Sequence, residues 1–246
     1  MERNILLTIE YDGTNFFGWQ RQPNVPTVQR EVERVLSILC KQDVLINGTS
    51  RTDAGVHAYG QRASFKGEFG IPTDRIMFAA NNLMDGAVRI KEVEEVPIDF
   101  HARYDSKGKT YLYKIANKRY KDPFDRNYKY TVTSSLDFEA MKAAAKHIVG
   151  THDFKCFEAA GGDVRESTVR TIYSLELKKE GDDILLYVKG DGFLYNMVRI
   201  ITGTLVDVGL GKINADSLVD IINSKDRGRA GHTAPPNGLY LVEIYY

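Results

Sequence analysis

Residues 27–47, TVQREVERVLSILCKQDVLIN, decide the fold class because they contain two different hydrophobic periodicities. Thr27 has the short hydroxyl side chain that often caps the N-terminus of a helix. The apolar residues that follow recur at the spacing of one buried helical face: Val28, Val32, Val35, Leu36 and Leu39. Residues 44–47, which come next, are short and β-like. The segment therefore predicts a helix followed by a strand, which is typical of an α+β protein.

The same alternation extends outward from this segment through the first part of the chain. Strands are predicted at 5–11, before the helix, and at 61–66, after it. A second helix at 74–84 and a strand at 88–93 complete the series. We therefore expect residues 1–104 to form a lobe of the βαββαβ type.

The second half repeats this order, so we expect residues 105–246 to form a second lobe. The predicted elements are a strand at 109–117, a helix capped by Asp137 and ended by Gly150, strands at 168–178 and 184–189, a helix at 195–208, a helix from Asn214 to 223, and a strand at 239–246. Segments 128–132 and 151–166 are extra pieces. Each lobe resembles the ferredoxin-like or RRM-like arrangement. The fold prediction is two such lobes sharing a mostly antiparallel sheet, with a central cleft.

Composition excludes several classes of protein. Of 246 residues, 43% are apolar and 27% are charged, which is close to the average for soluble globular proteins. No stretch approaches the roughly 20 apolar residues of a membrane span, and the N-terminus shows no secretory signal. The two cysteines, Cys40 and Cys156, are far apart and suggest neither a zinc site nor a disulfide framework. We expect a cytoplasmic protein without a membrane partner.

The net charge is zero, with 33 basic and 33 acidic residues, and does not by itself indicate a nucleic-acid partner. Residues 101–131 are an exception, because basic side chains outnumber acidic ones there and alternate with tyrosines and phenylalanine. Such a mixture suits phosphate contacts combined with base stacking. A pair of strands with a solvated basic face explains the same pattern, and composition does not decide between the two.

Residues 48–58, GTSRTDAGVHA, are the densest candidate for chemistry. They lie between two predicted strands, where a rigid scaffold holds a loop. Arg51 favours the charged form of a nearby carboxylate, so Asp53 suits the role of a nucleophile or base. The alternative is a polar turn in which Asp53 caps backbone amides, and the spacing alone favours that alternative.

The loop resembles the catalytic loop of the tRNA pseudouridine synthases of the TruA family. Residues 51–57, RTDAGVH, match the family's motif at every position. Further segments resemble the family in the right order: YDGTNFFGWQRQ at 11–22, KTYLYKI around Tyr111, DGFLYNMVRIITG at 191–203 and TAPPNGLYLV near the end. The resemblance thus spans the whole chain.

The resemblance implies a role for each of four residues. Asp53 corresponds to the essential aspartate, and Tyr111 to the tyrosine that packs against the target uracil. Arg199 corresponds to the arginine that pairs with the catalytic carboxylate, and Arg51 to one that helps to displace the target base. The implied enzyme is a homodimeric isomerase that forms pseudouridine at positions 38, 39 and 40, in the anticodon arm of tRNA.

The chemistry of this isomerisation agrees with the residues. No redox change occurs and no group is imported, so we expect no cofactor and no metal, and the chain lacks dinucleotide and P-loop motifs. A stacked uridine must be flipped into a pocket, where Tyr111 offers a flat surface. Arg199 lies in an apolar helical pattern and needs a partner there. The residues leave open whether Asp53 attacks the base or the sugar.

Two other functions fit parts of the pattern. A catalytically inactive RNA-binding protein of the same fold would not need Asp53, Arg51 and Arg199. A glycosylase or glycoside hydrolase with a carboxylate nucleophile would usually need a second carboxylate as acid, which this loop does not offer. We also expect Trp19 to lie in the core and His57 to orient the loop. Residues 152–162, HDFKCFEAAGG, depart from the family pattern in a loop that we expect to border the RNA.

Overall fold

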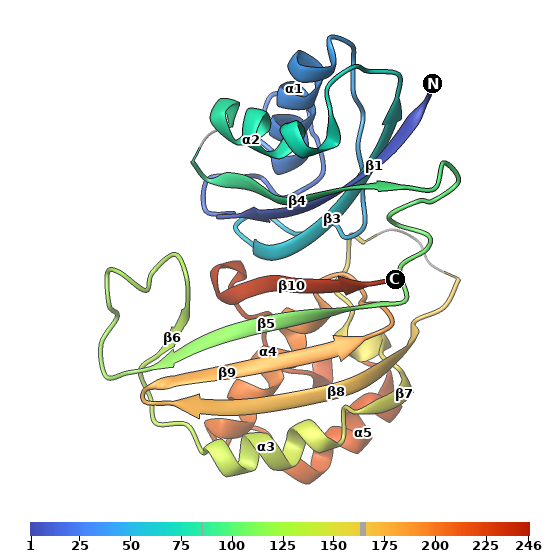
Figure 1. Cartoon of the computed structure of the whole chain (residues 1–246). Helices are drawn as coiled ribbons and strands as arrows, with labels where there is room; N and C mark the ends of the chain where they lie inside the picture. Colours follow the sequence, from blue (N-terminus) through green and yellow to red (C-terminus); the bar gives the residue numbers. More distant parts are fainter. Residues whose placement is uncertain (85, 163–165) are drawn as a thin grey trace. The chain divides into compact units, whose positions relative to one another are not determined.

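The structure is a computed structural model that describes residues 1–84, 86–162 and 166–246 (Figure 1). The chain forms two compact units: Met1–Lys107 together with Tyr240–Tyr246, and Gly108–Leu239. Both units combine helices with a sheet, so the prediction of an α+β fold is confirmed. Of the extra segment expected at 151–166, residues 163–165 lie outside the described part of the chain.

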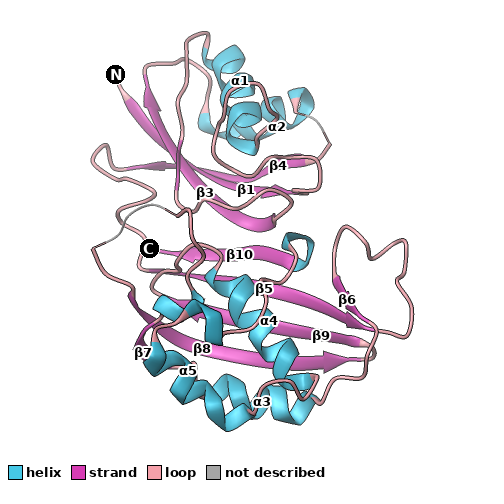
Figure 2. Ribbon diagram, turned by 180° about the vertical axis from the view of Figure 1, so that it is seen from behind, coloured by secondary structure: helices cyan, strands magenta, loops and turns pink. Residues whose placement is uncertain are grey.

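The first unit is a mixed sheet with two helices on one face (Figures 1 and 2). Its strands follow the order β4-β1-β3-β10, with β2 paired to β3, and all pairs are antiparallel except β3 with β10. The bounds are β1 Arg3–Tyr11, α1 Val28–Cys40, β2 Asn47–Gly48, β3 His57–Gly67, α2 Thr73–Leu83, β4 Val88–Val96 and β10 Leu239–Tyr245. The sequence prediction placed this last strand in the second half, but it hydrogen-bonds with β3.

Helix α1 forms as its pattern predicts. Thr27 is the N-cap, and its hydroxyl accepts a hydrogen bond from the backbone N–H of Arg30 at 3.4 Å. Val28 and Val32 are fully buried, as are Val35 and Leu36. The helix therefore buries one apolar stripe against the sheet, which is the main source of its stability.

The strand predicted at 44–47 is wrong for most of its length, because only Asn47 and Gly48 pair with β3. Side chains of α1 form hydrogen bonds with the backbone of residues 44–46, just before β2. The Glu33 carboxylate accepts from the N–H of Ile46 at 3.0 Å, and the Gln29 amide donates to the carbonyl of Ile46 at 3.0 Å. Ser37 Oγ likewise accepts from the N–H of Val44 at 2.9 Å. These contacts take the place of a strand ladder.

The second unit is an antiparallel sheet in the order β5-β9-β8-β7, with β6 paired in parallel to the end of β5. Its three helices lie on one face, in front of the sheet in Figure 2 and behind it in Figure 1. The bounds are β5 Gly108–Asn117, β6 Tyr130–Val132, α3 Phe138–Lys146, β7 Gly150–Asp153, β8 Val169–Glu180, β9 Asp183–Gly190, α4 Met197–Gly209 and α5 Leu218–Ser224.

Two helices of this unit differ at their ends from the prediction. Asp137 caps α3 as expected, but the helix ends at Lys146 and Gly150 instead opens β7 with φ near +121°. Asn214 caps a short 3-10 turn, Ala215–Ser217, and α5 begins only after it. The polar sequence of β7, GTHD, has no apolar alternation, so its pairing with β8 could not be read from the pattern.

No helix within the described residues has the length and apolar character that crossing a membrane requires.

Candidate active site

The loop of residues 49–56, between β2 and β3, is fixed at its first residues by hydrogen bonds to β3. Thr49 donates its N–H to the carbonyl of Arg62 at 2.9 Å, and its hydroxyl reaches the carbonyl of Ala102 at 2.9 Å. The side chain of the fully buried Gln61 donates to the carbonyl of Ser50 at 2.6 Å. Side chains thus satisfy the buried backbone at the start of the loop, which restricts its movement.

The segment after β1, which contains the motif YDGTNFFGWQRQ, holds the middle of the loop. The N–H of Trp19 donates to the carbonyl of Thr52 at 3.1 Å, and the hydroxyls of Tyr11 and Thr52 lie 2.8 Å apart. Gly18 has φ near +85°, and a Cβ on it would lie 2.5 Å from the Thr52 carbonyl oxygen. The two backbones approach so closely that only glycine fits there.

His57 supports the far end of the loop, as expected. It is 2% exposed, its ring stacks on Tyr240 at 4.7 Å, and its Nδ1 accepts from the N–H of Gly13 at 3.1 Å. The Asp12 carboxylate oxygen lies 3.2 Å from the same nitrogen. Trp19 is 1% exposed, so its predicted place in the core is also confirmed.

Asp53 therefore lies on a loop that is anchored on both sides. Thr52 is buried, Asp53 is half-buried and Arg51 is exposed. The backbone turns sharply after Asp53, because the N–H of Val56 donates back to the carbonyl of Asp53 at 3.1 Å and Gly55 has φ near +78°. A half-buried carboxylate on a fixed loop can meet a substrate without reorganisation of the backbone.

Tyr111 and Arg199 belong to the second unit. Tyr111 lies on β5, opposite Val188 of β9, and is 6% exposed. Phe193 meets the Tyr111 ring edge-on, with the ring centres 5.2 Å apart. This packing fixes the ring, which suits a flat surface for a base.

Arg199 is half-buried, whereas every other residue of α4 is buried. Its Nε donates to the carbonyl of Ala234 at 2.8 Å, and one terminal nitrogen donates to Oδ1 of Asn196 at 2.7 Å. The guanidinium is therefore held in place by a backbone carbonyl and a side-chain amide, which satisfies part of its hydrogen-bonding capacity.

Residues 232–238, HTAPPNG, form a common support for several groups of this unit, and we call them the 232–238 segment. Besides Arg199, Tyr113 binds it: the Tyr113 hydroxyl donates to the carbonyl of Pro235 at 2.6 Å. Burial raises the pKa of Tyr113 well above its usual value, so the hydroxyl keeps the proton that it donates. Asp207 accepts from Nδ1 of His232 at 3.0 Å in turn.

The structure thus places two predicted residues in each unit: Arg51 and Asp53 in the first, Tyr111 and Arg199 in the second. Their action on one substrate stays a prediction. Sequence reasoning missed the supporting residues Tyr11, Gly18 and Gln61. The first two lie in the motif at 11–22, whose function in holding the loop no periodicity reveals.

The loop at 152–162 contains Cys156 within a 3-10 turn, Lys155–Phe157. Cys156 is fully buried, whereas Lys155 is exposed and its Nζ lies 2.7 Å from the Glu158 carboxylate. Among the residues that the structure describes, no group of three or more His, Cys, Asp or Glu side chains could hold a metal ion.

Comparisons with known proteins identify the family of this chain. The family model described as tRNA pseudouridine synthase matches residues 7–105 and 144–246. These ranges contain Arg51, Asp53 and Arg199, and leave Tyr111 in the unmatched span. The chain therefore belongs to the tRNA pseudouridine synthase family.

Individual relatives match over their full length. The chain is 51% identical over 244 residues to tRNA pseudouridine synthase A of Acetivibrio thermocellus, covering 99% of this chain and 100% of the relative. It is 51% identical over 245 residues to the protein of that name in Ruminiclostridium cellulolyticum, with the same coverage. A relative in Clostridium tetani, tRNA pseudouridine synthase A 2, is 46% identical over 248 residues.

Solved structures are more distant. A crystal structure of the archaeal box H/ACA sRNP Nop10-Cbf5 complex matches with a TM-score of 0.37 and 10% identity, covering 97% of this chain and 46% of that chain. A likeness at this level adds nothing to the assignment.

Proposed function

We propose that this protein isomerises uridine to pseudouridine in tRNA, with Asp53 as the catalytic carboxylate. The observation that supports this proposal most is the match to full-length relatives, which are named tRNA pseudouridine synthase A and are up to 51% identical to this chain. The anchored loop is the second support, because it presents Asp53 half-buried on a backbone that is fixed from both sides.

The reaction needs little from the protein besides one positioned nucleophile. The bond from uracil N1 to ribose C1′ breaks, and a bond from C5 to C1′ forms. The proton that leaves C5 balances the proton that N1 gains, so no electrons, groups or energy are supplied from outside. An ionised carboxylate can carry the covalent step. Its fixed position lowers the entropic cost of reaching a near-attack geometry.

The other three residues have supporting functions in this proposal. Tyr111, whose ring Phe193 holds in place, packs against the flipped uracil. Arg199 balances the charge of the catalytic carboxylate, and Arg51 helps to displace the uridine from its stack.

We further propose that the substrate is the anticodon arm, modified at positions 38, 39 and 40, and that the working enzyme is a cytoplasmic homodimer. A dimer would present two copies of the basic and aromatic segment 101–131, which fits a nucleic-acid substrate in a chain with no net charge.

The substitution Asp53→Asn tests the catalytic proposal. It keeps the size of the side chain and removes the nucleophilic charge. Pseudouridine formation on unmodified tRNA should fall by about four orders of magnitude or more, because no other group supplies the covalent step. Chemical mapping of pseudouridine in the tRNA product gives both the rate and the modified positions.

The control is Asp74→Asn, which removes the same charge from the exposed first turn of α2. It should leave the rate unchanged, and both variants should bind tRNA. Wild-type activity in Asp53→Asn would contradict the mechanism. A wild-type protein that binds tRNA and forms no pseudouridine would instead favour the inactive RNA-binding alternative.

A further inference from the structure

The loop between β5 and β6, residues 118–129, lies within the basic and aromatic segment 101–131, and we call it the β5–β6 loop. It projects from the end of the second unit's sheet (Figures 1 and 2). The family model matches residues 7–105 and 144–246, so this loop lies outside the matched ranges.

The two acidic side chains of the loop form ion pairs with two of its lysines. Lys118 Nζ lies 2.7 Å from one oxygen of Asp125 and 3.5 Å from Asp122. Lys129 Nζ lies 3.1 Å from the other oxygen of Asp125 and 2.7 Å from Asp183, at the start of β9. The hydrogen bond from Lys118 holds the pKa of Asp125 below its usual value. These charges neutralise one another and hold the loop together.

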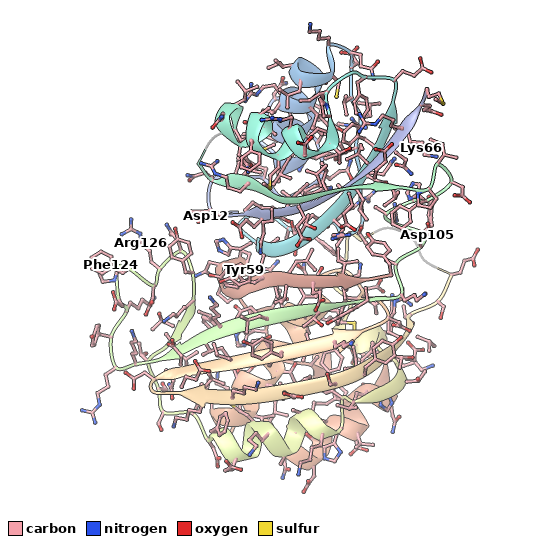
Figure 3. The ribbon with its side chains drawn as sticks, viewed as in Figure 1. Asp12, Tyr59, Lys66, Asp105, Phe124 and Arg126 are labelled. Atoms are coloured by element: carbon pink, nitrogen blue, oxygen red, sulfur yellow. The ribbon has the colours of Figure 1, made fainter. Side chains whose placement is uncertain are left out.

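The remaining charged side chains of the loop are all positive. Arg119, Lys121 and Arg126 are exposed, and the described residues offer them no ion-pair partner. Exposed rings alternate with them: Tyr120 is 65% exposed, Phe124 87% and Tyr128 41%. Figure 3 shows Phe124 and Arg126 pointing away from the loop. The outer surface is thus cationic and aromatic, and the loop as a whole has five basic side chains against two acidic ones.

This surface is held rigid by the 232–238 segment. The side-chain amide of Asn237 donates to the carbonyl of Arg126 at 2.8 Å and to that of Lys129 at 2.7 Å. Asp122 Oδ1 accepts from the N–H of Phe124 at 2.9 Å. Because these hydrogen bonds already fix the backbone of the loop, the loop loses less conformational entropy when it binds a partner.

We propose that the β5–β6 loop is an RNA-binding element that contacts phosphates through Arg119, Lys121 and Arg126 and stacks an unpaired base on Phe124. The inference rests on the proposed function, because it assigns the loop to the tRNA substrate. Unopposed cations beside exposed rings suit a polyanion with flat bases. A protein interface would instead show a contiguous apolar centre depleted in charge.

The charge component is tested with the triple variant Arg119→Ala, Lys121→Ala, Arg126→Ala. Its matched control, Lys142→Ala, Lys146→Ala, Lys179→Ala, removes the same charge from exposed positions on α3 and β8 of the same unit. The dissociation constant for an unmodified tRNA transcript is measured at several salt concentrations. The logarithm of the association constant falls linearly with the logarithm of the salt concentration. Each lost phosphate contact makes this slope less steep by about 0.7 to 0.9.

The loop variant should therefore bind about ten-fold or more weaker at moderate salt, with a slope reduced by about two to three. Its single-turnover rate at saturating tRNA should equal that of the wild type, because the loop binds rather than reacts. The control should keep the wild-type slope. A wild-type slope in the loop variant, or an equal loss in both triple variants, would overturn the proposal.

The stacking component is tested at Phe124. Phe124→Leu keeps an apolar side chain and removes the ring, whereas Phe124→Trp keeps a ring. Leucine should weaken tRNA binding about five-fold or more, and tryptophan should not. If both variants keep the wild-type affinity, or if both lose affinity equally, stacking on Phe124 is excluded.

The outcomes distinguish a failure of this inference from a failure of the proposed function. They also distinguish RNA binding by the loop from binding of a protein partner. If the wild type forms pseudouridine and the loop variants bind tRNA normally, the inference fails alone. If the wild type forms none while the loop variants lose affinity as expected, the proposed function fails and the RNA-binding element stands. Sedimentation of each variant tests the remaining alternative: a change in oligomeric state with intact tRNA binding would assign the loop to a protein interface and refute the proposal.

Discussion

The two cysteine thiols are chemically quiet because of where the fold places them. Cys156 is fully buried, and desolvation raises its pKa to about 12. Burial also raises the pKa of Cys40, which is 8% exposed. At pH 8 the Cys156 thiol therefore stays protonated, and the thiolate is the reactive form. We expect neither cysteine to react with a disulfide reagent in the native protein within an hour, and both to react in denaturant. Stoichiometric labelling of the native protein would show that one of these sites opens.

Arg199 shows how far single residues could be interpreted from the sequence. A lone arginine in an apolar helical pattern predicts a compensating partner, because an unpaired buried charge is costly. The structure shows two neutral hydrogen-bond acceptors for its guanidinium, the Ala234 carbonyl and the Asn196 amide oxygen, whereas the pairing with Asp53 stays a prediction. Ala234 is 35 residues further along the chain. Every residue has a backbone carbonyl, so the sequence does not show which one accepts the hydrogen bond. The need for a partner was therefore predictable, whereas this backbone partner was not.

At the scale of elements, the segment after β1 and the catalytic loop depend on each other. Gly18 combines φ near +85° with a Cβ position 2.5 Å from the Thr52 carbonyl oxygen. Gly18→Ala should therefore push the loop away from the segment and destabilise the protein by about 1 to 3 kcal/mol. The rate at saturating tRNA should fall more than the affinity, because displacing Asp53 affects the reacting geometry first.

The matched control is Gly70→Ala, since a Cβ at Gly70 meets nothing within 4 Å. It should change neither stability nor rate. Urea unfolding and single-turnover kinetics measure both quantities for each variant. Equal behaviour of the two alanine variants would show that the close approach at Gly18 is not needed to hold the loop.

Elements were predictable where one face is clearly apolar. The cap and buried stripe of α1 are as the sequence predicts, because burial of that stripe decides the structure. The strand expected at 44–47 is largely replaced by contacts from Glu33, Gln29 and Ser37 of α1. Those side chains bind the backbone of a segment that lies outside their own helix. The local sequence pattern of residues 44–47 therefore does not predict these hydrogen bonds.

At the scale of the whole molecule, the repeat of elements predicted two α+β halves, but not the position of the last strand. Tyr240 and Leu241 pair with His57 and Ala58 of β3, so the end of the chain joins the first unit. A pairing across such a sequence separation is selected by the fit of whole surfaces. Periodicity within a strand carries no information about which strand will be its neighbour.

The stability of the whole molecule should depend on pH through Asp207, which joins α4 to the 232–238 segment. Burial opposes its charged form, but hydrogen bonds from His232 and Lys212 outweigh this and hold the pKa of Asp207 below its usual value. A carboxyl group with a lowered folded-state pKa binds fewer protons in the folded protein. Its contribution is therefore present above the unfolded-state pKa of about 4 and is lost as the pH falls through the folded value.

Asp207→Asn should accordingly lower the free energy of unfolding at pH 7 by about 1 to 3 kcal/mol, because it loses the charged acceptor for His232 and Lys212. It should also flatten the decline of stability below about pH 5, since this position no longer titrates. Urea unfolding between pH 7 and pH 3 measures both effects, with Asp216→Asn, at an exposed position, as the control. If the acid slope of Asp207→Asn equals that of the wild type, other carboxylates govern the acid limit and Asp207 serves packing alone.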